Sequence, residues 1–222
     1  PAKWAVPLPN NLSLKESMIY GTAGFTAALS VFKLINSGVK KDKNNILVTG
    51  ASGGVGSLAC SILTKLGYKV TAATGKIDQK DYFKQLGVEE IIDRHDISDK
   101  TDKMLLHQKW AGVVDTVGGD ILANAVKATE YGGAVTCCGN VASPILDLNV
   151  YPFILRGISL LGVDSGRCDM NIRKKIWNYL ADDWKLENLN DIAHEINFDE
   201  INFYIDQILD SKNKGRILIK ID

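Results

Sequence analysis

The chain has 222 residues, of which 45% are hydrophobic and 23% charged, and its 26 basic and 26 acidic side chains give a formal net charge of zero. This is the composition of a globular protein with a sizeable core, and a neutral chain gives no electrostatic reason to expect nucleic acid or a membrane as a partner. We find no apolar run of the roughly 20 residues that a membrane span needs and no secretory leader, so we expect a cytoplasmic protein. The sequence also has no Cys-x-x-Cys or Cys/His metal pattern. We therefore expect four reduced, mostly buried cysteines and no bound metal.

The first 38 residues form two distinct stretches. Residues 1–12 hold three of the five prolines, which excludes a regular core element there. Residues 13–38 have the composition of a long helix, and Ser13 and Glu16 have the spacing of a capping box at its start. This helix also contains two glycines, Gly21 and Gly24, where a helix normally prefers alanine.

From residue 44 onward, apolar strands alternate with helices. We expect strands over 44–50, 68–74, 88–94, 111–118, 133–139 and 158–164, with helices over 57–67, 78–86, 100–110 and 120–132. Strands that are apolar on both faces and separated by helices are typical of parallel sheets covered on both sides. The sequence therefore predicts an α/β fold with a Rossmann-type doubly wound parallel sheet of six strands.

The last part of the chain has a different pattern. A helix over 170–186 precedes an alternating segment at 193–198, a short helix near 199–211 and a second alternating segment at 215–222. Alternation indicates strands with one exposed face. These two strands therefore need not join the parallel sheet.

The stretch VTGASGGVGSLA, residues 48–59, joins the first strand to the next helix and contains a GxGxxG pattern with alanine in first place. In such a loop Gly53 lets the backbone approach a pyrophosphate, and Gly56 lets the helix pack closely on the sheet. The first N–H groups of the helix then face the phosphates. A purely structural turn is the alternative, but the strand–loop–helix–strand context favours a dinucleotide site.

The end of the second strand indicates which dinucleotide is bound. NAD sites carry an acidic residue about 20 residues beyond the glycines, which binds the ribose hydroxyls. Here that position reads Thr74-Gly75-Lys76, and an ammonium attracts the 2′-phosphate that a carboxylate would repel. Asp78 could be a displaced ribose ligand, although it fits better as the cap of the next helix, and Lys76 could be a solvated surface lysine. We predict NADPH over NADH.

Several segments together resemble one family, the zinc-independent medium-chain dehydrogenases/reductases, and within it the acryloyl-CoA reductase/quinone oxidoreductase group. They are GTAGFTAAL (21–29), ILVTGASGGVG (46–56), TGK (74–76), VVDTVGG (113–119), YGGAVTCCG (131–139), PFILRGISLLGVDS (152–165) and GRILIKI (215–221). Such enzymes have an N-terminal GroES-like β domain, which would precede residue 1. The resemblance thus implies a connecting segment at 1–12, an NADP-binding domain at 13–186 and a C-terminal segment at 187–222 that returns toward the catalytic domain. It implies a fragment that is inactive alone, with its proton donor elsewhere.

The resemblance also implies a set of coenzyme-binding residues. It places Ser52, Gly53, Gly54 and Val55 at the pyrophosphate, Thr74, Gly75 and Lys76 at the 2′-phosphate with Arg94 beside the adenine, and Thr26, Asn140, Ile154 and Ser165 toward the nicotinamide half, with Asn213 as a further candidate. Simpler roles remain open for three of them. Thr26 could bond its own helix backbone, Arg94 could be a surface ion-pair partner, and Ser165 could merely end a strand. No histidine is assigned a catalytic role.

The expected activity is NADPH-dependent hydride transfer, without zinc, to an activated double bond of an enoyl-CoA or to a quinone. A non-catalytic NADPH-binding module with a redox-sensing or structural role is the alternative. A short-chain dehydrogenase would need a Tyr-x-x-x-Lys pair, and the nearest approach, Tyr82 and Lys84, has the wrong spacing. The resemblance further implies a homodimer paired through the sixth strand, which would otherwise be an exposed apolar edge.

Overall fold

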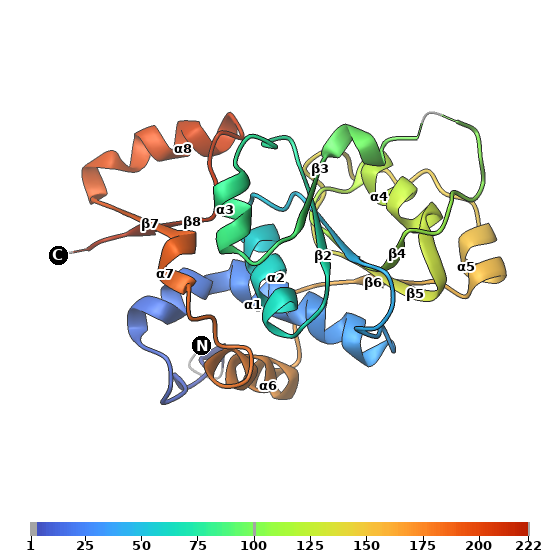
Figure 1. Cartoon of the computed structure of the whole chain (residues 1–222). Helices are drawn as coiled ribbons and strands as arrows, with labels where there is room; N and C mark the ends of the chain where they lie inside the picture. Colours follow the sequence, from blue (N-terminus) through green and yellow to red (C-terminus); the bar gives the residue numbers. More distant parts are fainter. Residues whose placement is uncertain (1–3, 100, 222) are drawn as a thin grey trace.

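A computed structural model describes residues 4–99 and 101–221 of the chain (Figure 1). Six parallel strands form the main sheet in the order β3-β2-β1-β4-β5-β6. Their bounds are β1 (Ile46–Thr49), β2 (Val70–Thr74), β3 (Glu90–Asp93), β4 (Trp110–Asp115), β5 (Thr129–Cys137) and β6 (Ser159–Gly162). This is the predicted Rossmann-type arrangement, in which the chain reverses direction across the sheet between β1 and β4.

Helices cover both faces of this sheet. The helices of the described chain are α1 (Leu14–Asn36), α2 (Gly54–Lys65), α3 (Lys80–Gln85), α4 (Gly119–Lys127), α5 (Tyr151–Arg156), α6 (Met170–Ala181), α7 (Leu189–Ile192) and α8 (Ile201–Leu209), with 3-10 turns η2 (Arg94–Ile97) and η3 (Phe198–Glu200); α7 and α8 lie beside the small sheet of β7 (Ala193–Ile196) and β8 (Arg216–Ile219) described below (Figure 1). Successive residues of β1 point to opposite faces. Val48 packs in the core cluster built with α1, α2, α3 and α6, whereas Leu47 packs in the cluster built with α4. The strands are therefore buried on both sides, as their apolar sequences predict.

Helix α1 is the central element of the larger core. Its capping box is present, since the Glu16 backbone N–H donates to the Ser13 hydroxyl over 3.1 Å and the Ser13 N–H donates to the Glu16 carboxylate over 2.7 Å. Its length and composition would allow it to cross a membrane, which corrects the expectation that no run is long and apolar enough. However, 67% of its most apolar window is buried inside the protein. It is thus placed as a core helix, with Gly21 (φ 48°) interrupting its helical geometry.

The helix expected over 100–110 is wrong for every residue that the structure describes there. Residues 101–109 are extended and irregular, and Trp110 already opens β4. Their backbone groups bond to distant partners: Leu106 N–H donates to the Lys127 carbonyl over 3.0 Å, and Arg156 donates to the Leu106 carbonyl over 2.6 Å. Tertiary hydrogen bonds therefore replace the helical ones that the local pattern favours.

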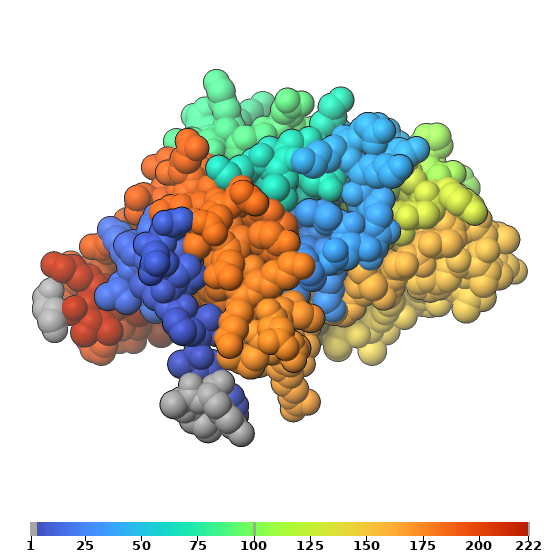
Figure 2. Space-filling model, turned by 90° about the horizontal axis from the view of Figure 1, so that it is seen from below, coloured from blue at the N-terminus to red at the C-terminus, as the bar shows by residue number. Residues whose placement is uncertain are grey.

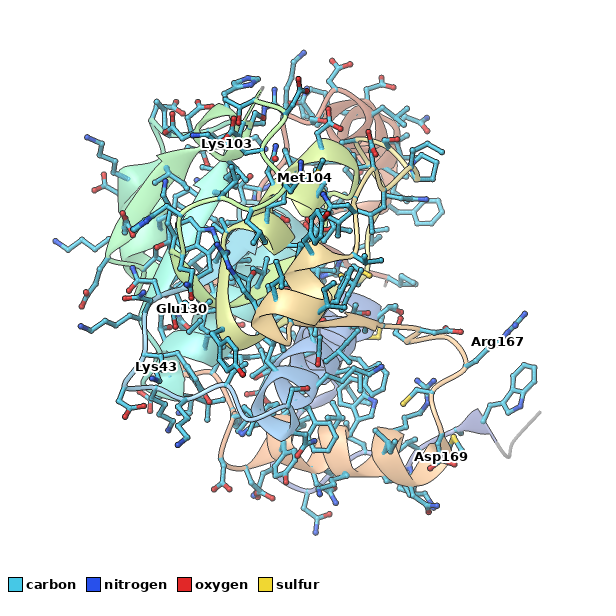
Figure 3. The ribbon with its side chains drawn as sticks, turned by 90° about the vertical axis from the view of Figure 1, so that its right-hand side faces the viewer. Lys43, Lys103, Met104, Glu130, Arg167 and Asp169 are labelled. Carbon is cyan, nitrogen blue, oxygen red and sulfur yellow. The ribbon has the colours of Figure 1, made fainter. Side chains whose placement is uncertain are left out.

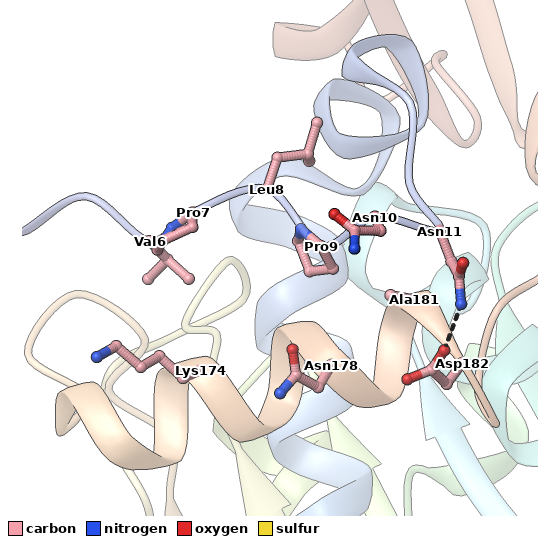
Figure 4. A pocket seen from close by; sticks show the side chains of 10 residues that line it. All are labelled: Val6, Pro7, Leu8, Pro9, Asn10, Asn11, Lys174, Asn178, Ala181 and Asp182. Carbon is pink, nitrogen blue, oxygen red and sulfur yellow. Dashed lines mark hydrogen bonds between the residues drawn. The ribbon is translucent and has the colours of Figure 1, made fainter.

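The segments near the two ends of the chain lie outside the main sheet. Asn11 donates to the carboxylate of Asp182 over 2.6 Å, so the segment before α1 runs along α6 and borders a pocket there (Figure 4). Figure 2 shows the same segment, in dark blue, against the orange surface of α6. Strands β7 (Ala193–Ile196) and β8 (Arg216–Ile219) pair in parallel as a separate small sheet, which confirms that the late strands stay outside the main one.

Candidate functional site

The site is built at the carboxyl ends of β1 and β4, where the strand order reverses. Open α/β sheets bind ligands in the crevice at this point. Thr49 ends β1, and Asp115 ends β4 beside it. The loop that follows β1 is the glycine loop, residues 50–56, so the predicted phosphate-binding sequence lies at the topological position that the fold offers for a ligand.

The glycine loop has the tight geometry that its sequence predicts. Gly50 has a positive φ of 60°, and the Gly53 N–H donates to its carbonyl over 2.9 Å. A Cβ at Gly56 would lie 2.3 Å from the Gly50 carbonyl oxygen, so α2 can pass this close only with glycine there. No described side chain caps α2 at Gly53. Its first N–H groups and its dipole thus favour an anion.

A buried carboxylate joins the ends of the two central strands. Asp115 is fully buried, accepts a hydrogen bond from the Thr49 hydroxyl over 2.7 Å and another from the Gly118 N–H over 2.9 Å. Burial raises the pKa of Asp115, and these hydrogen bonds oppose that rise. The Thr116 hydroxyl donates to the Thr49 carbonyl over 2.9 Å. This network fixes the floor of the crevice, and sequence analysis assigned Asp115 no role.

The predicted 2′-phosphate residues meet at the end of β2. Thr74 donates to the Ser52 hydroxyl over 3.2 Å, and the Lys76 N–H donates to Thr74 over 3.1 Å. The Lys76 ammonium hydrogen-bonds the Asn213 carbonyl. Arg94 lies over Gly75, since a Cβ at that glycine would be 3.1 Å from the guanidinium carbon. The structure therefore brings these six residues together.

Asp78 does not have the capping role that sequence analysis preferred. Helix α3 begins at Lys80 with Gln79 as its N-cap residue, two residues later than the expected start at 78. Asp78 is exposed, and its charge raises the pKa of Lys76, while burial is the larger effect and lowers that pKa. The local sequence could not place this cap because no capping hydrogen bond forms at α3.

Arg216 is a functional candidate that sequence analysis missed. The Gly215 N–H donates to the Ser52 carbonyl over 2.9 Å, so residues 213–216, here called the crossing segment, lie on the glycine loop. The Arg216 guanidinium donates to the Ile19 carbonyl over 3.1 Å, and one of its nitrogens is 3.1 Å from where a Cβ at Gly54 would be. Burial lowers its pKa. A guanidinium thus lies at the N-terminus of α2, brought there from a distant part of the sequence.

The candidates for the nicotinamide half are less tightly grouped. Thr26 donates to the Thr22 carbonyl over 2.7 Å, the simpler role considered for it, and it also lines an open pocket of about 840 Å³ together with Val55 and Arg216. Asn140 is exposed beside the end of β4, where a Cβ at Gly118 would be 3.1 Å from its Cα. Both residues therefore lie at the crevice or its border.

Two of the expected residues stand apart from this group. Ile154 is 67% exposed on α5, whose Arg156 binds the Thr129 carbonyl at the start of β5, the opposite end from the crevice. The Ser165 carbonyl accepts from Arg173 over 2.7 Å. Ser165 belongs to the segment between β6 and α6, from which Arg167 extends away from the body of the protein (Figure 3). Neither residue contacts the glycine loop through a hydrogen bond within the described part of the chain.

The four cysteines are free, and they are less buried than expected. Cys60 is buried, while Cys137, Cys138 and Cys168 are half-buried. Burial raises the pKa of each thiol. Among the described residues, no group of three or more His, Cys, Asp or Glu side chains could hold a metal ion.

Comparisons with known proteins identify the family and the fold. A family model described as zinc-binding dehydrogenase matches residues 54–182. The chain is 37% identical to the acrylyl-CoA reductase AcuI of Ruegeria pomeroyi, covering 67% of that protein and all of this chain. It superposes on the crystal structure of Bacillus subtilis protein yhfP with NAD bound (TM-score 0.96, 47% identity, 100% of this chain and 68% of that one). It also superposes on the yhdH oxidoreductase of Salmonella enterica in complex with NADP (TM-score 0.95, 40% identity, 99% and 67%). The family description mentions zinc, but the described residues offer no donor set for it.

Proposed function

Because the chain belongs to the zinc-binding dehydrogenase family of medium-chain dehydrogenases/reductases, we propose that it binds NADPH and uses it to reduce an activated double bond or a quinone. Within this family it falls in the group of acrylyl-CoA reductases and quinone oxidoreductases. When bound, the coenzyme supplies the hydride. The chain supplies orientation and charge. We assign the coenzyme domain to residues 13–186, with the crossing segment completing the site from outside it.

The observation that carries the NADPH assignment is the set of side chains at the end of β2. A 2′-phosphate there would meet the Lys76 ammonium and the Arg94 guanidinium, while the buried Thr74 hydroxyl accepts the Lys76 N–H and holds that residue in place. Lys76 uses one of its three N–H donors on the Asn213 carbonyl, which leaves two for a phosphate. Of the nearby carboxylates, Asp78 is exposed and beyond the strand end, and Asp93, which pairs with Thr74 across β2 and β3, accepts the His95 N–H. The related structures hold either NAD or NADP, so this local chemistry is the basis for the choice.

We base the proposed positions of the pyrophosphate and the nicotinamide half on the geometry of the crevice. The pyrophosphate fits the N-terminus of α2, at Ser52 to Val55, where Arg216 adds a positive charge. The nicotinamide half then extends from there toward Asn140, Thr26 and the open pocket. We retain Ile154 and Ser165 as proposed nicotinamide neighbours on the resemblance alone.

Coenzyme titrations test the proposed function directly. Calorimetric titration of the protein with NADPH and with NADH should give a dissociation constant at least about ten-fold lower for NADPH, since charge-assisted hydrogen bonds contribute roughly 1.5–3 kcal/mol each. Addition of acrylyl-CoA or a quinone to the full-length enzyme should then oxidise NADPH. Equal affinities, or tighter NADH binding, would contradict the assignment.

Strand β6 leads to a prediction about assembly. It lies at the edge of the main sheet, with Ser159 and Gly162 exposed and two half-buried leucines between them. Unprotected edge strands tend to pair with another chain. We propose a homodimer with β6 paired to its copy across a two-fold axis.

Light scattering at micromolar concentration should therefore give twice the mass of one chain. Ser159→Lys, which brings two like charges together across the axis, should shift the protein toward monomer. The matched control is Ser98→Lys, another exposed serine on a distant loop, which should remain dimeric. A monomeric wild-type protein would refute the proposed dimer.

A further inference from the structure

The crossing segment carries a cation that the site described so far does not use. This cation is Lys214, and the residues on either side of it are fixed to the coenzyme site. Lys76 donates to the Asn213 carbonyl, and the Gly215 N–H donates to the Ser52 carbonyl over 2.9 Å. Lys214 lies between these two anchors. Its backbone is therefore held beside both Lys76 and the glycine loop.

The side chain of Lys214 is also held in place. Its ammonium lies 5.1 Å from the centroid of the Tyr82 ring, within the range of a cation–π contact. Tyr82 is buried in the main core on α3, and its hydroxyl oxygen is 2.9 Å from where a Cβ at Gly215 would be. The ring thus gives an exposed lysine a fixed surface to rest on next to the end of β2.

The positive charges around this position form no ion pair within the described part of the chain. None of Lys76, Arg94, Lys214 and Arg216 forms a salt bridge with another described residue. The charge of Lys214 reaches Lys76 and lowers its pKa, in addition to the larger effect of burial, and Asp78 opposes both. Cations held close together repel one another, and a bound anion relieves that repulsion.

We propose that Lys214 is a third cationic ligand of the coenzyme 2′-phosphate, acting with Lys76 and Arg94 from the other end of the chain. This rests on the proposed function, because only NADPH brings a phosphate to this position. A phosphate monoester carries about 1.5 to 2 negative charges and three acceptor oxygens at neutral pH, so it can accept hydrogen bonds from several cations at once. Specificity for NADPH would then be shared between the end of β2 and the crossing segment.

The experiment compares Lys214→Gln with Lys214→Arg and with a control, Lys212→Gln. Lys212 is two residues away, just before the crossing segment, and pairs with Asp210 over 2.7 Å, so its loss removes the same charge outside the site. Each protein is titrated with NADPH, NADH, 2′,5′-ADP and 5′-ADP. For Lys214→Gln we expect about ten-fold weaker binding of the two 2′-phosphorylated ligands and unchanged binding of the other two. Lys214→Arg and Lys212→Gln should bind all four like the wild type.

The outcomes separate this inference from the proposed function. If the wild type prefers NADPH and Lys214→Gln keeps that preference in full, the role of Lys214 is wrong and the NADPH assignment stands. If Lys214→Gln weakens all four ligands equally, Lys214 acts on the pyrophosphate or on the fold, and the inference is again overturned. If the wild type itself binds 2′,5′-ADP no better than 5′-ADP, the proposed function fails first.

Discussion

A Lys76→Glu variant should bind NADPH about 100-fold more weakly than the wild type, while its affinity for NADH changes little. Lys76 is half-buried, and its ammonium is oriented by the Asn213 carbonyl at the end of β2. The substitution removes a charge-assisted hydrogen bond of roughly 1.5–3 kcal/mol and adds repulsion between a carboxylate and the phosphate. Because NADH has no 2′-phosphate, it does not meet that repulsion. A carboxylate here could even bind the free ribose hydroxyls, as acids do in NAD sites.

The matched control is Lys43→Glu. Lys43 is exposed on the loop before β1, at the amino end of the sheet and therefore opposite the crevice (Figure 3). Both variants change the net charge by the same amount, so a general electrostatic effect on a charged ligand would appear in both. Dissociation constants for NADPH and NADH, measured for both variants at two salt concentrations, distinguish the cases. An unchanged coenzyme preference in Lys76→Glu would show that Lys76 is a solvated surface lysine.

The part of the site that sequence reasoning predicts is local in sequence. Gly53 and Gly56 are recognisable because a strand, a tight turn and a helix follow one another within a dozen residues, and their roles need no distant partner. Thr74, Gly75 and Lys76 are found by counting along the same unit. The strands themselves follow from apolar runs, since a strand buried on both faces has little choice of side chain.

The parts that sequence reasoning misses depend on contacts between distant segments. Arg216 lies at the N-terminus of α2 only because the crossing segment folds back onto Ser52, which is 163 residues earlier in the chain. Nothing in the pattern GRILIKI distinguishes that arginine from a surface one. Contacts between distant segments also explain why the helix predicted over 100–110 does not form at residues 101–109. The sequence of this stretch contains no glycine or proline to break a helix, but the Leu106 N–H donates to the Lys127 carbonyl at the end of α4, and Arg156 donates to the Leu106 carbonyl.

A Gly56→Ala variant should lose coenzyme binding and about 1–3 kcal/mol of its free energy of unfolding, because overpacking against rigid neighbours costs that much. The added methyl group would lie 2.3 Å from the Gly50 carbonyl oxygen and 2.7 Å from the Ala51 Cα. Both are backbone atoms, so no side chain can rotate away. Helix α2 would have to move off the loop, and its first N–H groups would no longer face the pyrophosphate. Urea unfolding and NADPH titration measure the two effects.

Alanine variants of two other glycines serve as comparisons for Gly56→Ala. A Cβ at Gly162 meets nothing within 4 Å and its φ is ordinary, so Gly162→Ala should keep wild-type stability and coenzyme affinity. At Gly53 the closest atom would be the Gly50 carbonyl oxygen at 3.3 Å, which needs a much smaller shift than the 2.3 Å contact at Gly56, so Gly53→Ala should lose less stability than Gly56→Ala. Its methyl group would instead stand where the pyrophosphate approaches the loop, and binding should fall. We expect Gly53→Ala to lose coenzyme binding but keep most of its stability, and Gly56→Ala to lose both. That result would show that Gly53 is needed for the approach of the phosphate and Gly56 for the packing of the helix. A Gly56→Ala protein that is stable and binds NADPH normally would contradict the loop geometry on which the site depends.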